Sequence, residues 1–140
     1  MMGGMTHRRV VLGFGAVLML AGCAPQGPLL ATDGGDTYAV IAAPSDFAME
    51  ALATGNLVID DNGCFAIEVG SAPSNVLWAH GSSLDGNRLQ IAGIDHSLGE
   101  GALISMGGGE VPADSDQPPC WNEGDTIWVM APDSAIEGIP

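Results

Sequence analysis

The sequence predicts an all-β domain, and two features of the chain after Thr37 carry this prediction. Apolar runs of four to seven residues are separated by Gly, Asn, Asp and Pro, which is typical of short strands joined by turns. Only the stretch 46–54 has the composition of a helix, and it could form no more than one or two turns. The expected strands are 38–42, 57–60, 64–69, 76–79, 88–94, 102–106 and 126–131. About six or seven such strands indicate a small closed or partly open β-barrel of the OB-like kind, with at most one short helix.

The turn at Asp61-Asn62-Gly63 decides how the strands on either side of it pair. A two-residue turn would mix apolar and polar side chains on both faces, whereas a three-residue loop with Gly63 left-handed pairs Ile59 with Phe65. A slip of one residue would move every side chain to the other face, so burial favours the second register. The face expected to be buried consists of Leu57, Ile59, Phe65, Ile67 and Val69. The opposite face holds Asp60, Cys64 and Glu68, and we expect its two acids to add little to stability.

The later segments show weaker patterns. Asp85-Gly86 indicates a turn before the 88–94 strand, and Gly107-Gly108-Gly109 indicates a bulge or sharp bend of the kind found where small barrels turn corners. The polar, Pro-bounded stretch 111–119 predicts a surface loop. The tail after Pro132 has no periodic pattern, so we expect it to be loosely held.

The first 22 residues have the three parts of an export signal. Arg8 and Arg9 precede an apolar run over 10–21, which is shorter than the roughly 20 residues that a membrane-spanning helix needs. The run ends in Leu20-Ala21-Gly22-Cys23, which resembles the bacterial lipobox, with Cys23 as the lipidated residue. An ordinary cleaved signal that leaves a free Cys23 thiol is the alternative. The paired arginines leave general secretion and twin-arginine export both open.

This leader defines the expected organisation of the chain. Residues 1–22 would be the signal peptide, 23–36 the lipidated cysteine with a flexible tether, and 37–140 the barrel domain. The expected location is the extracytoplasmic face of the cell membrane. The expected contact with the lipid bilayer is through acyl chains on Cys23, because stable anchoring requires more than one chain.

The charge of the chain excludes several classes of function. The sequence has no lysine, and removal of the leader leaves Arg88 as the single basic residue against 17 acidic ones, a net charge of −16. Nucleic acid is therefore excluded as a partner, because its binding depends on Lys and Arg neutralising phosphates. Without lysine there is also no P-loop, Schiff-base or Ser–Lys chemistry. We expect no cofactor.

Cys64 and Cys120 remain once Cys23 is assigned to lipid. Outside the cytoplasm, two remaining cysteines most simply form a disulfide bond, and the loop that this bond would close corresponds to about 4 kcal/mol of stability. Metal binding is the alternative, but neither cysteine has a second Cys or His at ligand spacing. The sequence therefore predicts a Cys64–Cys120 disulfide and no metal site.

Residues with potential chemistry are few. His80 precedes Ser82 and Ser83, and Asp95-His96-Ser97 contains the three residue types of a hydrolytic triad, although no nucleophile-elbow motif is present. Asp60-Asp61-Asn62-Gly63 resembles a calcium loop only superficially, because the alternating ligands and the closing Glu are missing. The three tryptophans are core residues or a binding face, and Trp121 is the one most expected to be exposed. The candidate ligand-binding residues are Trp78, His80 and Trp121.

Short motifs over most of the mature chain carry a family resemblance. They are Gly55-x-Leu57, Asn62-Gly63-Cys64-Phe65, Leu77-Trp78, Gly107-Gly108-Gly109 and Cys120. With the lipobox, they resemble small, largely uncharacterised lipoproteins and secreted domains of actinobacteria, which implies a compact β-barrel outside the membrane and no catalytic residues. The expected function is a non-enzymatic envelope module that binds an envelope protein or a small ligand. The alternatives are a small hydrolase using His80 or His96 and a purely structural envelope component.

Overall fold

A computed structural model describes residues 27–46 and 49–138, and this part of the chain is all-β without a helix. Consequently, it contains no helix of the length and apolarity needed to cross a membrane. The strands are β1 (Leu29–Thr32), β2 (Tyr38–Ile41), β3 (Ala51–Ile59), β4 (Phe65–Val69), β5 (Ala72–Trp78), β6 (Ser83–Asp85), β7 (Arg88–Gln90), β8 (Leu103–Pro112), β9 (Thr126–Met130) and β10 (Ile136–Glu137).

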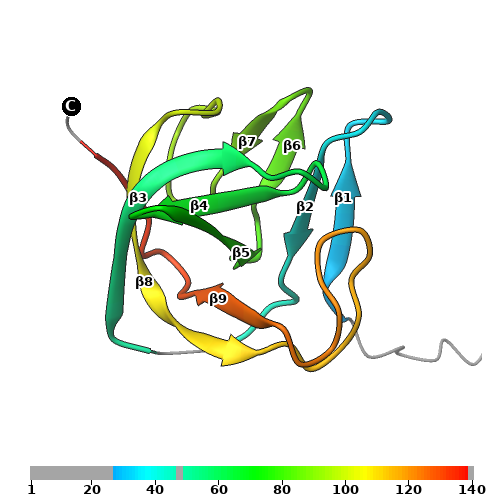
Figure 1. Cartoon of the computed structure of the whole chain (residues 1–140). Coiled ribbons are helices and arrows are strands. Elements are labelled where there is room, and N and C mark those ends of the chain that lie inside the picture. Colours follow the sequence, from blue (N-terminus) through cyan, green and yellow to red (C-terminus); the bar gives the residue numbers. More distant parts are fainter. Residues whose placement is uncertain (1–26, 47–48, 139–140) are drawn as a thin grey trace, which may run out of the picture.

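Five of the strands close into a barrel in the order β3–β4–β5–β9–β8, with β8 returning to β3 (Figure 1). Four of the five pairings are antiparallel, and the pairing of β5 with β9 is parallel, with Val76 opposite Trp128. The hairpin of β1 and β2 adds to this barrel through a parallel pairing of β2 with β5. The predicted small OB-like barrel is therefore confirmed.

The β3–β4 hairpin has the predicted three-residue register. Ile59 pairs with Phe65 and Leu57 with Ile67, and Gly63 is left-handed with φ 85°. A Cβ at Gly63 would lie 2.0 Å from the Asp36 carbonyl oxygen, so glycine is required both for conformation and for space. The predicted burial of Val69 is wrong, because the strand ends there at a tight turn and the side chain is 49% exposed.

Asp60 has a larger role than its place on the outer face indicates. Its Oδ1 atom accepts the backbone N–H groups of Asn62 and Cys64, each at 2.9 Å. The carboxylate thus replaces a backbone acceptor inside the loop, as Asp commonly does in turns. These two hydrogen bonds argue for a larger contribution of Asp60 to stability than its face alone predicts. The Glu68 side chain is half-buried and makes no such contact within the described residues.

The three consecutive glycines lie where β8 changes its partners. Gly107 and Gly108 pair with β3 on one edge, and Gly108 and Gly109 pair with β9 on the other. Gly108 has φ 151°, and a Cβ there would lie 2.0 Å from the Val129 carbonyl oxygen. The predicted bend is visible as the curvature of the yellow strand in Figure 1. Glycine here lets one strand turn the corner of the barrel.

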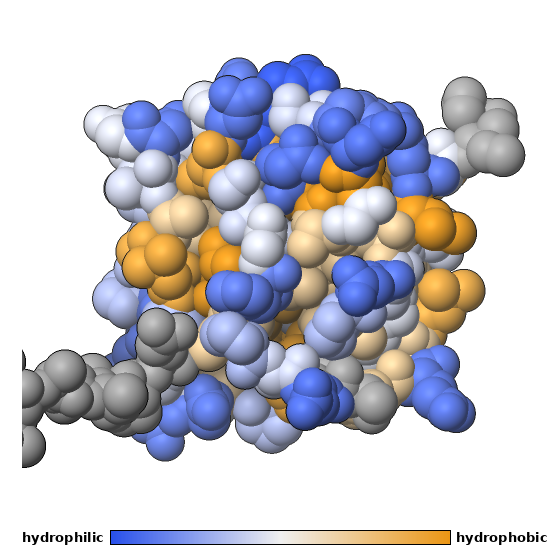
Figure 2. Space-filling model, turned by 180° about the vertical axis from the view of Figure 1, so that it is seen from behind, coloured by the Kyte–Doolittle hydropathy of each residue, from blue (hydrophilic) through white to orange (hydrophobic). Residues whose placement is uncertain are grey.

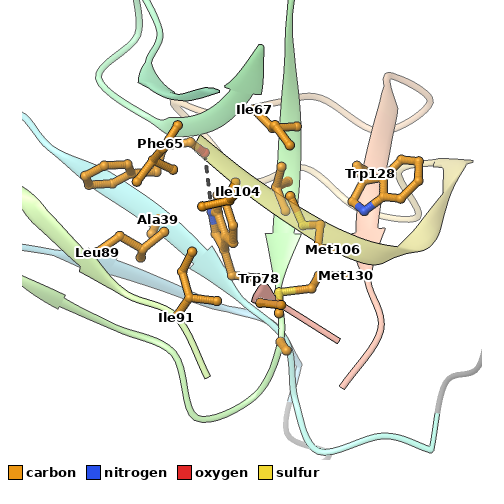
Figure 3. Packing of buried hydrophobic residues seen from close by; sticks show 14 of the residues in the cluster. Ala39, Phe65, Ile67, Trp78, Leu89, Ile91, Ile104, Met106, Trp128 and Met130 are labelled. Carbon is orange, nitrogen blue, oxygen red and sulfur yellow. Dashed lines mark hydrogen bonds between the residues drawn. The ribbon is translucent and has the colours of Figure 1, made fainter. Parts of the chain in front are cut away.

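The main core fills the barrel interior (Figure 3). Trp78 and Phe65 are its largest fully buried side chains, and the Trp78 indole Nε1–H donates to the Phe65 carbonyl oxygen at 3.4 Å. The connection between β5 and β8 forms the β6–β7 hairpin at the predicted Asp85-Gly86 turn. This connection adds Leu89, Ile91 and Leu98 to the core.

A second apolar cluster lies on the outside of the barrel. Alternate residues of β5 and β9, including Leu77 and Val129, face this cluster, while their neighbours face the interior. Its centre is the predicted Cys64–Cys120 disulfide, which has a Cα–Cα distance of 5.6 Å and is confirmed. The cluster consists of Val40, Cys64, Ala113, Cys120, Trp121 and Ile127. We call segment 113–125, which carries Cys120 and Trp121, the covering loop.

Three other expectations require correction. The helix proposed for 46–54 is not formed in its second half, because 51–54 begins β3 and pairs with β8. The proposed tether contains β1, so a flexible segment could extend no further than residue 28. The C-terminal tail, expected to be loose, contains β10, which pairs with β8. The signal peptide and Cys23 lie outside the described residues.

Candidate functional site

Two adjoining hollows with mainly apolar walls lie on the surface of the described residues. The larger has a volume of about 620 Å³ and lies between β1, the end of β2 and β6. The smaller, about 310 Å³, lies towards β5 and β9. They share four residues, Ala42, Ala43, Pro44 and His80. We call the two hollows together the groove.

The local sequence explains why the surface is hollow here. After β2 ends, the Ala42 N–H still donates to the Trp78 carbonyl oxygen at 2.8 Å, which holds the chain against β5. Pro44 then has no N–H to continue the ladder, and the alanines before it leave space where larger side chains would fill it. On the other side, Gly81 at φ 93° turns the chain away directly after His80.

The groove contains no acidic or basic residue apart from His80, although the chain has 17 acids. Its walls are aliphatic, with Leu29, Ile41 and Leu84 as the larger side chains of the larger hollow. Figure 2 shows patches of apolar side chains among hydrophilic ones, including on the side of the molecule where β1 and β2 lie. The groove is therefore an uncharged apolar site on a strongly acidic domain.

His80 is the one predicted ligand-binding residue that reaches this site. It is exposed and lines both hollows. Trp78 is 0% exposed and Trp121 is 5% exposed, so neither can contact a ligand at the surface. The expectation that Trp121 is exposed is wrong, because the adjacent disulfide draws it into the second cluster.

The residues considered for a hydrolytic triad do not assemble as one. Ser82 is 7% exposed, and its Oγ atom accepts the Ala92 N–H at 3.0 Å. Ser97 Oγ accepts the Arg88 Nε–H at 3.1 Å. No acid lines the groove beside His80. The described geometry therefore provides no serine activated by a histidine.

His96 lies between two carboxylates instead. Its Nδ1 atom is 2.9 Å from Asp95 Oδ1, and its Nε2 atom is 2.8 Å from Glu137 Oε2. The hydrogen bond to Asp95 and the charge of Glu137 raise the pKa of His96, and the hydrogen bond to His96 lowers the pKa of Asp95. Both ring nitrogens must carry protons to donate both bonds. The imidazolium thus connects the turn before β8 to strand β10.

This arrangement predicts a pH dependence for the attachment of β10. Because the pKa of His96 is raised on folding, the protonated ring stabilises the folded state. This stabilisation is complete below the unfolded pKa of 6.5 and is lost as the pH rises through the folded pKa. The lowered Asp95 pKa gives stabilisation present above 3.8 and lost as pH falls through its folded value. Proton NMR titration of the His96 ring should show a midpoint above 6.5, and Glu137→Gln should lower it. An unchanged midpoint in Glu137→Gln would contradict the contact.

Neither a metal site nor the usual ligand face of an OB barrel is open among the described residues. These residues contain no group of three or more His, Cys, Asp or Glu side chains arranged to hold a metal ion. In OB barrels, the loops between the first two and the last two strands flank the ligand face. Here those loops contain Gly63 and the covering loop, and the disulfide joins them. A hollow beside these loops is lined by polar and acidic residues such as Asp36, Asp60 and Asp61, whereas the apolar groove lies away from them.

Sequence reasoning identified His80 but not the rest of the groove. The walls come from four separate segments, 27–32, 41–45, 77–84 and 129–132, which the fold brings together. The one local signal was Ala42-Ala43-Pro44, small residues and a proline directly after a strand. No protein-family model, curated protein or solved structure matches the chain.

Proposed function

We propose that the protein is a lipoprotein anchored through Cys23 on the outer side of the cell membrane, where its barrel acts as a non-enzymatic binding module. The lipobox after a charged and apolar leader supports the anchor. The observation that carries the binding role is the groove: an uncharged, aliphatic hollow maintained on a domain with a mature charge of −16. Such pockets with a few polar groups are the usual form of ligand sites.

The two alternatives have less support from the geometry. A hydrolase would need His80 or His96 beside a free serine, but Ser82 and Ser97 accept other hydrogen bonds, and His96 is held by carboxylates. Exposed Ser83 lines the larger hollow with His80, but the described lining contains no acid to orient that histidine. A purely structural component gains nothing from an open apolar hollow, whose walls lose contact with water only when a ligand covers them. Binding is therefore the function that best accounts for the groove.

Cys23→Ser should release the protein from the membrane. The thiol is the atom that takes the lipid, and without acyl chains nothing in the acidic domain favours an anionic bilayer surface. Fractionation should move the protein from the membrane to the soluble fraction. Mass spectrometry of the wild-type protein should find a diacylated N-terminus at Cys23. A wild-type protein that is soluble and cut elsewhere would refute the anchor.

Binding in the groove is tested with Nile red, a neutral apolar dye. Ala43→Trp places an indole where the two hollows meet and should abolish the dye's fluorescence increase. Ala51→Trp adds the same side chain at an exposed position on β3 that lines neither hollow, and it should bind as the wild type does. Equal dye binding by both variants would place the site outside the groove and overturn the proposed binding role.

A further inference from the structure

We propose that the groove holds the hydrocarbon chain of a neutral lipid taken from the membrane in which Cys23 is anchored. This inference rests on the proposed function and specifies its ligand. Three properties of the described residues lead to it: the position of the groove in the chain, the aliphatic character of its walls, and the absence of charge in it.

The position of the groove brings it close to the membrane. Gly27 and Leu29 line the larger hollow, and Cys23 precedes Gly27 by four positions. An extended chain covers at most about 3.6 Å per residue, so Gly27 lies no more than about 14 Å from an anchored Cys23. The headgroup region of the bilayer is therefore within reach of the groove whenever the anchor is inserted. Membrane lipids are then the most concentrated apolar molecules near it.

The walls suit a flexible hydrocarbon chain better than a flat ligand. Among the described residues, 27–46 and 49–138, no Phe, Tyr or Trp lines either hollow. Sites for bases and other flat rings usually offer aromatic side chains for stacking, and the described part of the lining offers aliphatic ones instead. Leu29, Ile41 and Leu84 instead provide methyl groups around a volume of about 620 Å³. This volume is within the roughly 300–1,000 Å³ of small-molecule pockets.

The charges of the domain and of the groove favour a lipid with a neutral headgroup. Among the described residues, no Lys or Arg lines the groove to pair with a phosphate or carboxylate, His80 is its one basic side chain, and the 17 acids of the domain repel anions. At the edge of the larger hollow, the exposed Thr32, His80 and Ser83 can form hydrogen bonds with hydroxyl or ester oxygens. A neutral headgroup such as that of an acylglycerol fits these groups.

The experiment uses soluble Cys23→Ser protein and monoacylglycerols with saturated chains of increasing length, which compete with Nile red. Each additional methylene should lower the dissociation constant about fourfold until the groove is full. A fourfold change corresponds to the free energy of burying one CH₂ group. Fatty acids of the same length should bind at least about tenfold more weakly at low salt, and high salt should reduce this difference.

Variants locate the effect. Ala43→Trp and Leu29→Ser should each weaken monoacylglycerol binding at least about tenfold, the first by filling the groove and the second by removing an apolar wall. Leu29 is 66% exposed, so we expect Leu29→Ser to keep the fold. It therefore tests the groove even if Ala43→Trp does not fold. Ala51→Trp should bind normally. Circular dichroism confirms that each variant is folded.

Three outcomes would overturn the lipid assignment. The first is Nile red binding that monoacylglycerols displace equally well at every chain length. The groove would then be a binding site whose ligand is not a lipid chain, such as a peptide. Binding by Cys23→Ser but not by the acylated wild type would show that the protein's own acyl chains fill the groove. Preference for fatty acids would refute the headgroup argument. Loss of Nile red binding in every variant, including Ala51→Trp and Cys23→Ser, would instead reject the proposed function itself.

Discussion

Replacing both barrel cysteines, as Cys64→Ala with Cys120→Ala, is expected to lower the free energy of unfolding by about 4 kcal/mol. The two residues are 56 apart, and cross-linking a loop of this length removes a corresponding amount of entropy from the unfolded chain. The loss is large because the ordinary stability of a domain is about 5–15 kcal/mol. Within the described residues, the disulfide is the covalent cross-link between the middle of the covering loop and the start of β4.

Guanidinium unfolding in a Cys23→Ser background measures this change and prevents exchange with a third thiol. Cys23→Ser alone is the control and should unfold as the wild-type domain does. Trp121 provides a second measurement, because a loosened covering loop should shift its emission to the red as the indole leaves the second cluster. A loss below about 1 kcal/mol would mean that apolar packing alone holds this loop.

Phe65→Ala should lower the free energy of unfolding by about 3–5 kcal/mol, through lost burial and the cavity that remains. Phe65 is 1% exposed and lies against Trp78 in the barrel interior (Figure 3). Its carbonyl oxygen accepts the Trp78 indole, and this bond is made by the backbone and does not require the phenyl ring. The cost therefore comes from packing.

Two variants on the same strand control for position. Glu68→Ala and Val69→Ala should each change the free energy of unfolding by less than about 0.5 kcal/mol, because one side chain is half-buried and the other is 49% exposed. Urea denaturation of the three proteins compares them directly. If Glu68→Ala were as damaging as Phe65→Ala, the register of the hairpin would be wrong by one residue.

The features predicted correctly from the sequence depend on local chemistry or on simple counting. The hairpin register follows from one left-handed Gly63 and the alternation of apolar residues around it, all within a short window. The disulfide follows from the two cysteines that remain once Cys23 is set aside for lipid, together with the expectation of an oxidising compartment. The barrel class follows from the number and length of the apolar runs, and the bend in β8 from its three glycines.

The features that were missed depend on partners distant in the sequence. Residues 51–54 have helical composition, but the hydrogen bonds offered by β8 place them in a strand. Trp121 is buried because its neighbour is cross-linked to Cys64. The contact of His96 with Glu137 joins segments that no periodicity relates. The groove likewise lies between four segments that are distant in the sequence, and no single segment contains a pattern that predicts it.

The parallel pairing of β5 with β9 determines when the barrel can close. β9 ends at Met130, near the C-terminal end of the chain, and it joins β5 to β8. No nascent chain that stops before Thr126 can complete the ring, and until then one edge of β5 lacks this partner. Closing such a distant contact is slow compared with forming a hairpin, so barrels of this kind fold in milliseconds to seconds. Closure of the ring therefore has to wait for residues 126–130, although the β3–β4 and β4–β5 hairpins can form earlier.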